Sequence, residues 1–166
     1  IDRAWTTSDQ LAIQGGSNGG LLVGAALTQH PERYRAVACS APLLDMVRYE
    51  LFGLGESWNV EYGSAADPEQ LAALFAYSPV HNVHKGTEYP AVLFTVFEGD
   101  TRVDPLHARK LCAALQWATS GDPARRPILL RRETGVGHGA RAISRRIDLA
   151  ADTMAFLANH AGLALG

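Results

Sequence analysis

The sequence predicts an α/β fold in which a mostly parallel, doubly wound sheet carries helices on both faces. Short apolar runs of strand length alternate with longer stretches whose apolar residues recur at helical spacing. A glycine-rich hexapeptide, residues 15–20, joins the first apolar run to the first helical stretch. With 166 residues, of which 47% are hydrophobic and 19% charged, the chain is long enough for one domain with a sizeable core.

The first part of the chain is expected to supply two strands and the helix between them. Residues 2–7 are interpreted as a helix end, and the strands are predicted over residues 11–14 and 36–40. The helix is predicted over residues 19–29. It ends there because Pro31 disfavours the helical conformation in the residue before it.

The middle of the chain combines a helical pattern with an irregular, aromatic segment. Residues 43–52 show apolar positions at helical spacing, and residues 56–62 form an aromatic loop bracketed by glycines. A second helix is predicted to run to about Phe75. It starts with Asp67 as its N-cap and Pro68 at its first position, which are the residue types that helix starts favour.

The last part of the chain is expected to alternate strand, helix, strand and helix. Residues 91–97 form the strongest strand pattern, and residues 127–132 form the other strand. Helices are predicted over residues 105–117 and 142–159. The last helix is amphipathic, with apolar residues at helical spacing, namely Ile143, Ile147, Ala150, Ala151, Met154, Phe156 and Leu157.

Charge and composition exclude several classes of function. The formal net charge of −2 gives no electrostatic case for nucleic-acid binding, and no apolar run is long enough to span a membrane. Cys39 and Cys112 lie in apolar segments, so we expect buried free thiols rather than a disulfide. No cluster of cysteine and histidine has the spacing of zinc ligands. We therefore expect no metal and no other cofactor.

The glycine-rich hexapeptide fits the pattern of a nucleophile elbow. In Gly15-x-Ser17-x-Gly19, a serine occupies a sharp turn between a strand and a helix, and the neighbouring glycines avoid clashes with the adjoining strand and helix. The amino end of the helix would face the position where an oxyanion forms. A phosphate-binding loop is the alternative, but such a loop favours a nearby lysine, which this stretch lacks.

Two further polar residues follow predicted strands. Asp100 comes after the strand at residues 91–97, and His138 lies in a glycine loop after the strand at residues 127–132. In parallel sheets, ligands bind beyond the carboxyl ends of the strands, so both residues are expected near Ser17. His138 would take the proton of Ser17, and Asp100 would orient the imidazole.

Each of these assignments has an alternative. Asp100 on its own could be a turn residue, and His138 on its own could be an ordinary loop histidine. Glu98 and Asp104 are rival acids, although Asp104 is better interpreted as the cap of the helix that begins at Pro105. The remaining histidines, including His107, are interpreted as surface or capping residues.

Three motifs together resemble the prolyl oligopeptidase family. They are the elbow Gly-Gly-Ser-Asn-Gly-Gly, the segment Asp100-Thr101-Arg102-Val103-Asp104-Pro105-Leu106-His107, and the loop Gly137-His138-Gly139. The resemblance covers nearly the whole chain. It implies the C-terminal part of an α/β-hydrolase fold, and a serine endopeptidase that cleaves short peptides after proline through an acyl-enzyme. Thr101 departs from the family's usual second aspartate.

The resemblance also implies binding roles for particular residues. Trp58 matches the tryptophan that stacks on the substrate proline ring, and a flat indole selects that ring by packing. Asn18 matches the residue whose backbone N–H donates to the oxyanion, and Arg102 matches the arginine that holds a substrate carbonyl. Alternatively, Trp58 is a core aromatic, and Arg102 merely neutralises Asp100. The further pocket walls implied are Tyr62, Val103 and Leu43.

On the same resemblance, residues 1–166 are a single, partial peptidase domain. The parent is expected to add upstream strands, a β-propeller, and a tyrosine hydroxyl as second oxyanion donor. Removing one oxyanion donor costs on the order of 10²–10³ in rate. We therefore expect the isolated chain to fold poorly or to be inactive. A cytoplasmic location is expected, with a periplasmic or secreted one left open.

We expect the partner of the parent protein to be a proline-containing oligopeptide substrate, with no obligate protein partner. Three alternative functions remain. The chain could belong to an exopeptidase or an esterase without proline selectivity, or it could be a truncated, non-catalytic module that kept the fold.

Overall fold

The computed structural model describes residues 1–139 and 141–163, and its centre is a four-stranded sheet in the order β1-β2-β3-β4. All three neighbouring pairs are parallel, and Gly16 at the end of β1 stands beside Ser40 at the end of β2. The carboxyl ends of the strands therefore share one edge of the sheet. The strands are β1 (Ala12–Gly16), β2 (Ala36–Ser40), β3 (Ala91–Phe97) and β4 (Ile128–Glu133).

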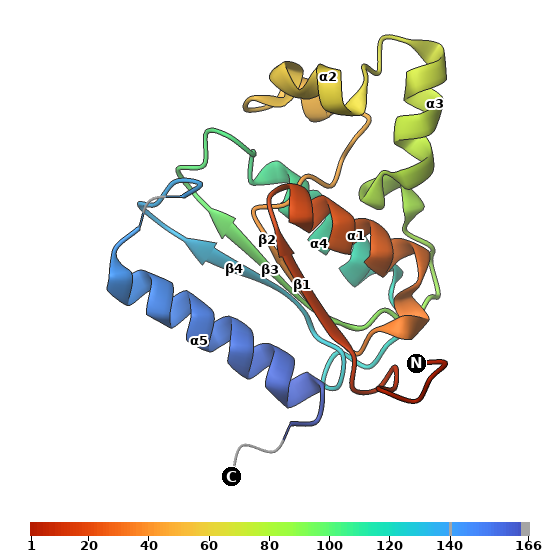
Figure 1. Ribbon diagram of the computed structural model, residues 1–166, viewed down its shortest axis with the longest axis vertical. Helices are drawn as coiled ribbons and strands as arrows, with labels where there is room; N and C mark the ends of the chain where they lie inside the picture. Colours follow the sequence, from red (N-terminus) through yellow and green to blue (C-terminus); the bar gives the residue numbers. More distant parts are fainter. Residues whose placement is uncertain (140, 164–166) are drawn as a thin grey trace.

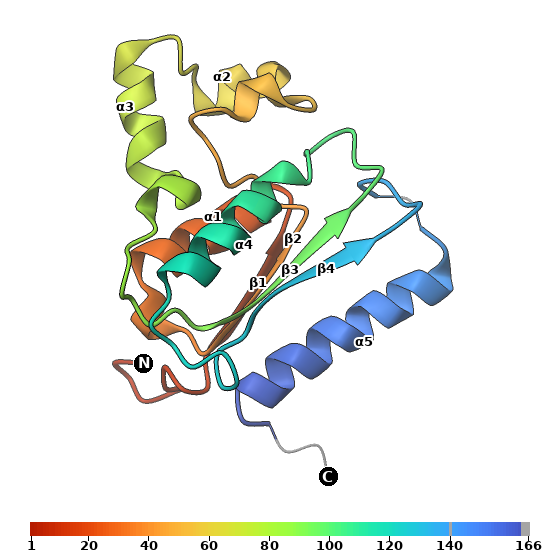
Figure 2. The same ribbon diagram turned by 180° about the vertical axis from the view of Figure 1, so that it is seen from behind.

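Helices cover both faces of this sheet. Helices α1 (Asn18–Gln29) and α4 (Leu106–Ala118) lie on one face, and α5 (Ile143–His160) lies on the other (Figures 1 and 2). The main core lies between the sheet and the helices α1 and α4. Its fully buried members include Leu27, Val37, Phe94, Leu111 and Leu115. The predicted fold class, a parallel sheet covered on both faces, is confirmed.

The middle of the 50-residue connection between β2 and β3 forms an arm beyond the sheet, seen at the top of Figure 1. It contains α2 (Asn59–Tyr62) and α3 (Pro68–Tyr77). Asp67 caps α3 as predicted, because its carboxylate accepts from the backbone N–H groups of Glu69 and Gln70. The connection also contains 3₁₀ turns at Tyr49–Leu51, Gly55–Trp58 and Pro79–Asn82, and a further 3₁₀ turn, Pro31–Arg33, lies between α1 and β2.

The helical pattern at residues 43–52 was a wrong prediction, since only a 3₁₀ turn at Tyr49–Leu51 forms there. Side chains from elsewhere take the backbone donors that a helix would use. His107 Nδ1 accepts from the N–H groups of Leu44 and Asp45, and Ser78 Oγ accepts from that of Met46. Apolar residues of the segment are buried although no helix forms. Because neighbouring residues are buried in different directions, the sequence shows closely spaced apolar positions, which resemble a helical pattern.

His107 itself was wrongly interpreted as a surface or capping residue. It lies on the buried face of α4, with 1% of its surface exposed. Because its Nδ1 accepts two backbone N–H groups, the imidazole is neutral in the folded chain. Burial lowers the pKa of His107 to about 4. The sequence did hold a signal, since His107, Leu111 and Leu115 share one helical stripe.

Two other expectations at the ends of the chain need correction. Residues 2–7 form turns instead of a helix end, and Trp5 in this stretch is 87% exposed. Helix α5 is present, but Ile143, Ile147 and Met154 of its apolar stripe lie exposed. The side chains on α5 that approach the core or lie partly covered include Leu149 and Phe156.

Both cysteines of the chain lie in its apolar interior. Cys39 and Cys112 are buried free thiols, as predicted, and burial raises the pKa of both. Within residues 1–139 and 141–163, no helix has the length and hydropathy needed to cross a bilayer. The same residues contain no group of three or more histidine, cysteine, aspartate or glutamate side chains arranged to hold a metal ion.

The turn between β1 and α1 leaves no room for a side chain at several glycine positions of the hexapeptide. Ser17 has φ 54° and ψ −123°, a strained conformation for a residue with a side chain. A Cβ at Gly15 would collide with the carbonyl of Gly19, and one at Gly20 would collide with Pro42. A Cβ at Gly19 would meet nothing within 4 Å, so the expectation that every flanking glycine avoids a clash fails there.

We predict that Gly15→Ala and Gly19→Ala differ sharply in stability. The first forces a methyl group into the backbone of the next turn and should cost about 1–3 kcal/mol of unfolding free energy. The second places a methyl group in open space in the first turn of α1 and should change stability by less than about 1 kcal/mol in either direction. Chemical denaturation of the two variants beside the unchanged chain measures this, and equal losses would contradict it.

We also predict an acid-sensitive contribution from His107. Its pKa is about 4 in the folded chain and about 6.5 when unfolded, so the unfolded state binds more protons between these values. The contribution of neutral His107 to the free energy of unfolding is fully present above about pH 6.5. It is lost as the pH falls towards 4, and the total loss is about 3 kcal/mol. The measurement is unfolding free energy against pH.

The matched variant for this titration is His107→Asn, which keeps an acceptor near the position of Nδ1 and cannot titrate. It should be less stable at neutral pH, because it leaves a cavity, but its stability should fall less between pH 6.5 and 4. Both proteins keep His81 and His160, whose pKa values burial also lowers. The difference between the two profiles therefore isolates His107, and parallel profiles would show that it does not titrate in this range.

Candidate active site

The three polar residues predicted at strand ends meet at one edge of the sheet. Ser17 follows β1, Asp100 follows β3, and His138 lies in the loop after β4. The His138 Nδ1–H donates to Asp100 Oδ2 over 2.7 Å, and His138 Nε2 lies 3.1 Å from Ser17 Oγ. The imidazole therefore bridges the carboxylate and the hydroxyl, and its Nε2 is placed to accept the hydroxyl proton.

The backbone fixes the serine in this position. Ser17 N–H donates to the carbonyl of Ser40 over 2.9 Å, which continues the β1–β2 pairing by one residue. Structural β1 therefore extends to Gly16, two residues beyond the predicted strand. The chain then reverses directly into α1, whose first residue is Asn18. The strained serine is held between a strand end and a helix start.

The Asp100 carboxylate is almost completely withdrawn from solvent, with 1% of its side chain exposed. Its other oxygen, Oδ1, accepts from the backbone N–H groups of Arg102 and Val103, each over 2.9 Å. Asp100 is thus both the partner of His138 and the organiser of the turn that leads to α4.

The two rival acids have other partners. Glu98 pairs with Arg132 over 2.9 Å at the surface, and Asp104 accepts from the N–H of Leu106 in the first turn of α4. Among the described residues, the ion-pair partner of Asp100 is His138, and the exposed Arg102 side chain is not one. The alternative in which Arg102 neutralises Asp100 is therefore excluded.

The predicted pocket residues gather in one apolar cluster beside the serine turn. Leu43 and Val103 are buried in it, each with 2% of its surface exposed, so they form its floor. Trp58 and Tyr62 are half-buried and pack against this floor from the arm. Leu21 of α1 belongs to the same cluster, which connects it to the helix that starts at the serine turn.

Several residues that shape this cluster were missed by sequence reasoning. The Tyr49 hydroxyl lies 2.7 Å from Asn59 Oδ1 and 2.5 Å from the Gly63 carbonyl, so it ties down both ends of α2. Its ring packs edge-on against Tyr62, with 5.6 Å between the centroids. Glu61 was also missed, although it accepts from the Asn18 side chain. Nothing in the sequence pattern points to these pairings.

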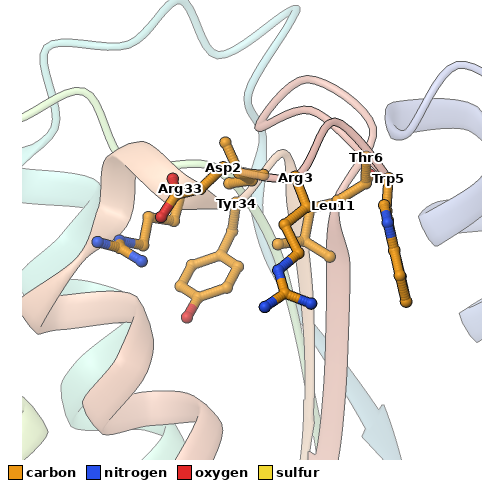
Figure 3. A pocket seen from close by; sticks show the side chains of 8 residues that line it. Asp2, Arg3, Trp5, Thr6, Leu11, Arg33 and Tyr34 are labelled. Carbon is orange, nitrogen blue, oxygen red and sulfur yellow. The ribbon is translucent and has the colours of Figure 1, made fainter.

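A separate hollow of about 490 Å³ lies near the N-terminus, and Figure 3 shows its lining. Leu11 precedes β1 and Tyr34 precedes β2, so this hollow lies at the amino ends of the strands. Arg3, Arg33 and Asp2 give it a mixed charge. It lies at the opposite end of the sheet from Ser17 and takes no part in the site described above.

The geometry agrees with comparisons to known proteins. The model of the prolyl oligopeptidase family matches residues 1–164. A prolyl endopeptidase of Elizabethkingia miricola is 38% identical over 161 residues, which cover 96% of this chain and 22% of that protein. A prolyl endopeptidase of Dictyostelium discoideum is 35% identical over 158 residues, or 94% of this chain and 21% of that protein.

Solved structures give the same result. A chain from a structural and mechanistic analysis of two prolyl endopeptidases is 47% identical, with a TM-score of 0.93, over 99% of this chain and 24% of that one. A post-proline cleaving enzyme from Rickettsia typhi is 37% identical, with a TM-score of 0.88, over 95% of this chain and 22% of that one. The chain spans about a fifth of the length of the curated relatives it matches.

The fold is therefore that of the α/β-hydrolase domain of these enzymes. The resemblance inferred from the three motifs is confirmed over nearly the whole sequence. This chain belongs to the prolyl oligopeptidase family.

Proposed function

We propose that this chain carries the catalytic residues of a serine endopeptidase that cleaves short peptides on the carboxyl side of proline. The observation that supports this best is the continuous contact from Asp100 through His138 to Ser17, with distances of 2.7 and 3.1 Å. Such a chain of contacts is what nucleophilic catalysis by a serine needs, because a free hydroxyl is a weak nucleophile.

In the proposed reaction, His138 Nε2 takes the proton of Ser17 Oγ as the oxygen attacks the peptide carbonyl carbon. Asp100 holds the imidazole in the tautomer with the proton on Nδ1 and stabilises its charged form. His138 then gives its proton to the leaving amine, and an acyl-enzyme forms on Ser17. Water, activated by the same imidazole, hydrolyses the ester and restores the serine.

The oxyanion is proposed to bind the backbone N–H of Asn18, the first residue of α1. Support comes from the position of Asn18, directly after the serine at the amino end of a 12-residue helix, where backbone N–H groups and the helix dipole favour negative charge. A second donor, a tyrosine hydroxyl, is expected from outside this chain.

Selection of proline is proposed to depend on the apolar cluster beside the serine. The half-buried Trp58 offers an indole face, Tyr62 forms a wall, and Val103 and Leu43 support them from below. A proline ring has no N–H to satisfy, so packing alone can select it. The Arg102 side chain, which is exposed and not paired with Asp100, is proposed to hold the carbonyl of the preceding substrate residue.

The proposal concerns the complete protein that contains this sequence, with an oligopeptide as the substrate. We propose that upstream strands and a β-propeller complete it, because the matched 161 residues are only 22% of the Elizabethkingia miricola relative. An exopeptidase or esterase without proline selectivity is the second candidate. The contacts among Asp100, His138 and Ser17 support both candidates, whereas the pocket residues and the similarity to prolyl endopeptidases favour the first.

We predict that a fluorophosphonate probe labels Ser17 in the complete protein and that His138→Ala slows this labelling by about 10²–10⁴-fold. The reason is that general-base assistance accounts for rate factors of this size. The measurement is the second-order rate of labelling, with the modified serine located by peptide mass.

His30→Ala is the matched control, because His30 is an exposed histidine that pairs with Glu32 and lies at the opposite end of α1 from Ser17. It should label at the unchanged rate. A folded complete protein that takes up no label at Ser17 would rule out serine catalysis and would favour a non-catalytic module.

We predict that Trp58→Ala lowers the preference for proline over alanine substrates by about 10- to 100-fold, since the variant loses the ring on which proline packs. The measurement is kcat/KM for two peptides that differ only at this residue. Trp117→Ala is the control, because Trp117 is 69% exposed on α4. An unchanged preference in Trp58→Ala would favour the exopeptidase or esterase.

A further inference from the structure

The side chain of Asn18 joins the serine turn to the arm. The Tyr62 hydroxyl donates to Asn18 Oδ1 over 2.9 Å, and Asn18 Nδ2 donates to Glu61 Oε1 over 3.2 Å. Asn18 follows Ser17 in the chain, whereas Glu61 and Tyr62 form the last turn of α2. Two hydrogen bonds therefore connect segments separated by more than 40 residues.

The two bonds fix the orientation of the amide. Rotating the Asn18 side chain by 180° would set its NH₂ group against the Tyr62 hydroxyl proton and its carbonyl against a carboxylate. Burial, followed by the charge of Glu61, raises the pKa of Tyr62 to about 12, so its hydroxyl stays a donor at physiological pH. An asparagine meets both demands, because it offers one acceptor and one donor group.

The part of the arm held in this way includes the pocket aromatics. Trp58 directly precedes α2, and Tyr62 ends it. Tyr49 fixes both ends of α2 from the side of the arm, through Asn59 and Gly63. Asn18 supplies the connection from the side of the serine. The position of the indole relative to Ser17 Oγ therefore depends on both connections.

We propose that the Asn18 side chain is a positioning residue that holds the proline pocket in register with Ser17, a role separate from that of its backbone N–H. This proposal rests on the proposed function. A substrate must place its proline ring on Trp58 and its carbonyl carbon at Ser17 Oγ at the same time, and small misplacements of reacting groups are costly. The Asn18 amide sets the separation of the two.

The first test compares Asn18→Ala with Tyr62→Phe in the complete protein. Both variants remove the hydrogen bond between Tyr62 and Asn18, and both leave the backbone N–H of residue 18 in place; Asn18→Ala also removes the bond to Glu61. Tyr62→Phe should lower the ratio of kcat/KM for proline over alanine peptides by about 3- to 10-fold, the size expected for one net hydrogen bond, and Asn18→Ala should lower it at least as far. Combining them should cost little more than Asn18→Ala alone, because the bond to Tyr62 is already lost in that variant. Fluorophosphonate labelling of the same variants measures the reactivity of Ser17 separately, and it should fall less than the cleavage of proline peptides because the probe carries no proline.

The second test is a rescue. Asn18→Asp keeps the acceptor for Tyr62 but sets a carboxylate against Glu61, so the proline preference should fall at least as far as in Asn18→Ala. Adding Glu61→Gln supplies an amide donor to the new carboxylate and should restore the preference to within about twofold. A side chain with a merely structural role would not be rescued. Glu56→Gln, an exposed carboxyl in the same segment, is the control and should change nothing.

The possible results separate this proposal from the proposed function. Normal labelling with an unchanged proline preference in Asn18→Ala and Tyr62→Phe would overturn the positioning role and leave the peptidase intact. Loss of labelling in Asn18→Ala but not in Tyr62→Phe would show that the substitution disturbs oxyanion binding, and this result would also overturn the positioning role. A complete protein that neither labels nor cleaves would overturn both.

Discussion

The buried carboxylate of Asp100 is the interaction on which the site depends. One carboxylate oxygen accepts a hydrogen bond from the His138 ring, and the other accepts from the backbone N–H groups of Arg102 and Val103. A carboxyl group with 1% exposure is expensive to bury alone, and these hydrogen bonds offset that cost. Because Val103 also belongs to the apolar cluster, the Asp100 side chain connects His138 with that cluster.

Most of the fold and the three reactive positions could be predicted because they follow from local rules. Buried parallel strands appear as short apolar runs, as in β3, where all seven residues are buried. The carboxyl ends of parallel strands share an edge, so polar residues after β1, β3 and β4 had to approach one another. Asp67 could be assigned as a cap from residue type alone.

The features that could not be predicted depend on distant partners. The segment at residues 43–52 has a helical pattern, yet its backbone N–H groups donate to His107 and Ser78, which lie 32 to 63 residues further along the chain. The hydrogen bonds from Asn18 to Glu61 and Tyr62 join residues more than 40 positions apart, and no periodic pattern in the sequence indicates such pairs. Ile143 and Ile147 also match a helical stripe, but the pattern does not say whether anything covers them.

The order of the strands has a consequence for how such a protein can change over evolution. Each strand pairs with its neighbour in sequence, so the long connection between β2 and β3 can vary in length without altering any pairing. That connection carries Leu43, Trp58 and Tyr62, whereas Ser17, Asp100 and His138 all lie outside it. Lengthening a loop costs only about 0.6 kcal/mol for each doubling. Under the proposed function, the part of the pocket on this connection can therefore diverge while Ser17, Asp100 and His138 are inherited unchanged, as long as its contacts with Asn18 and Val103 are kept.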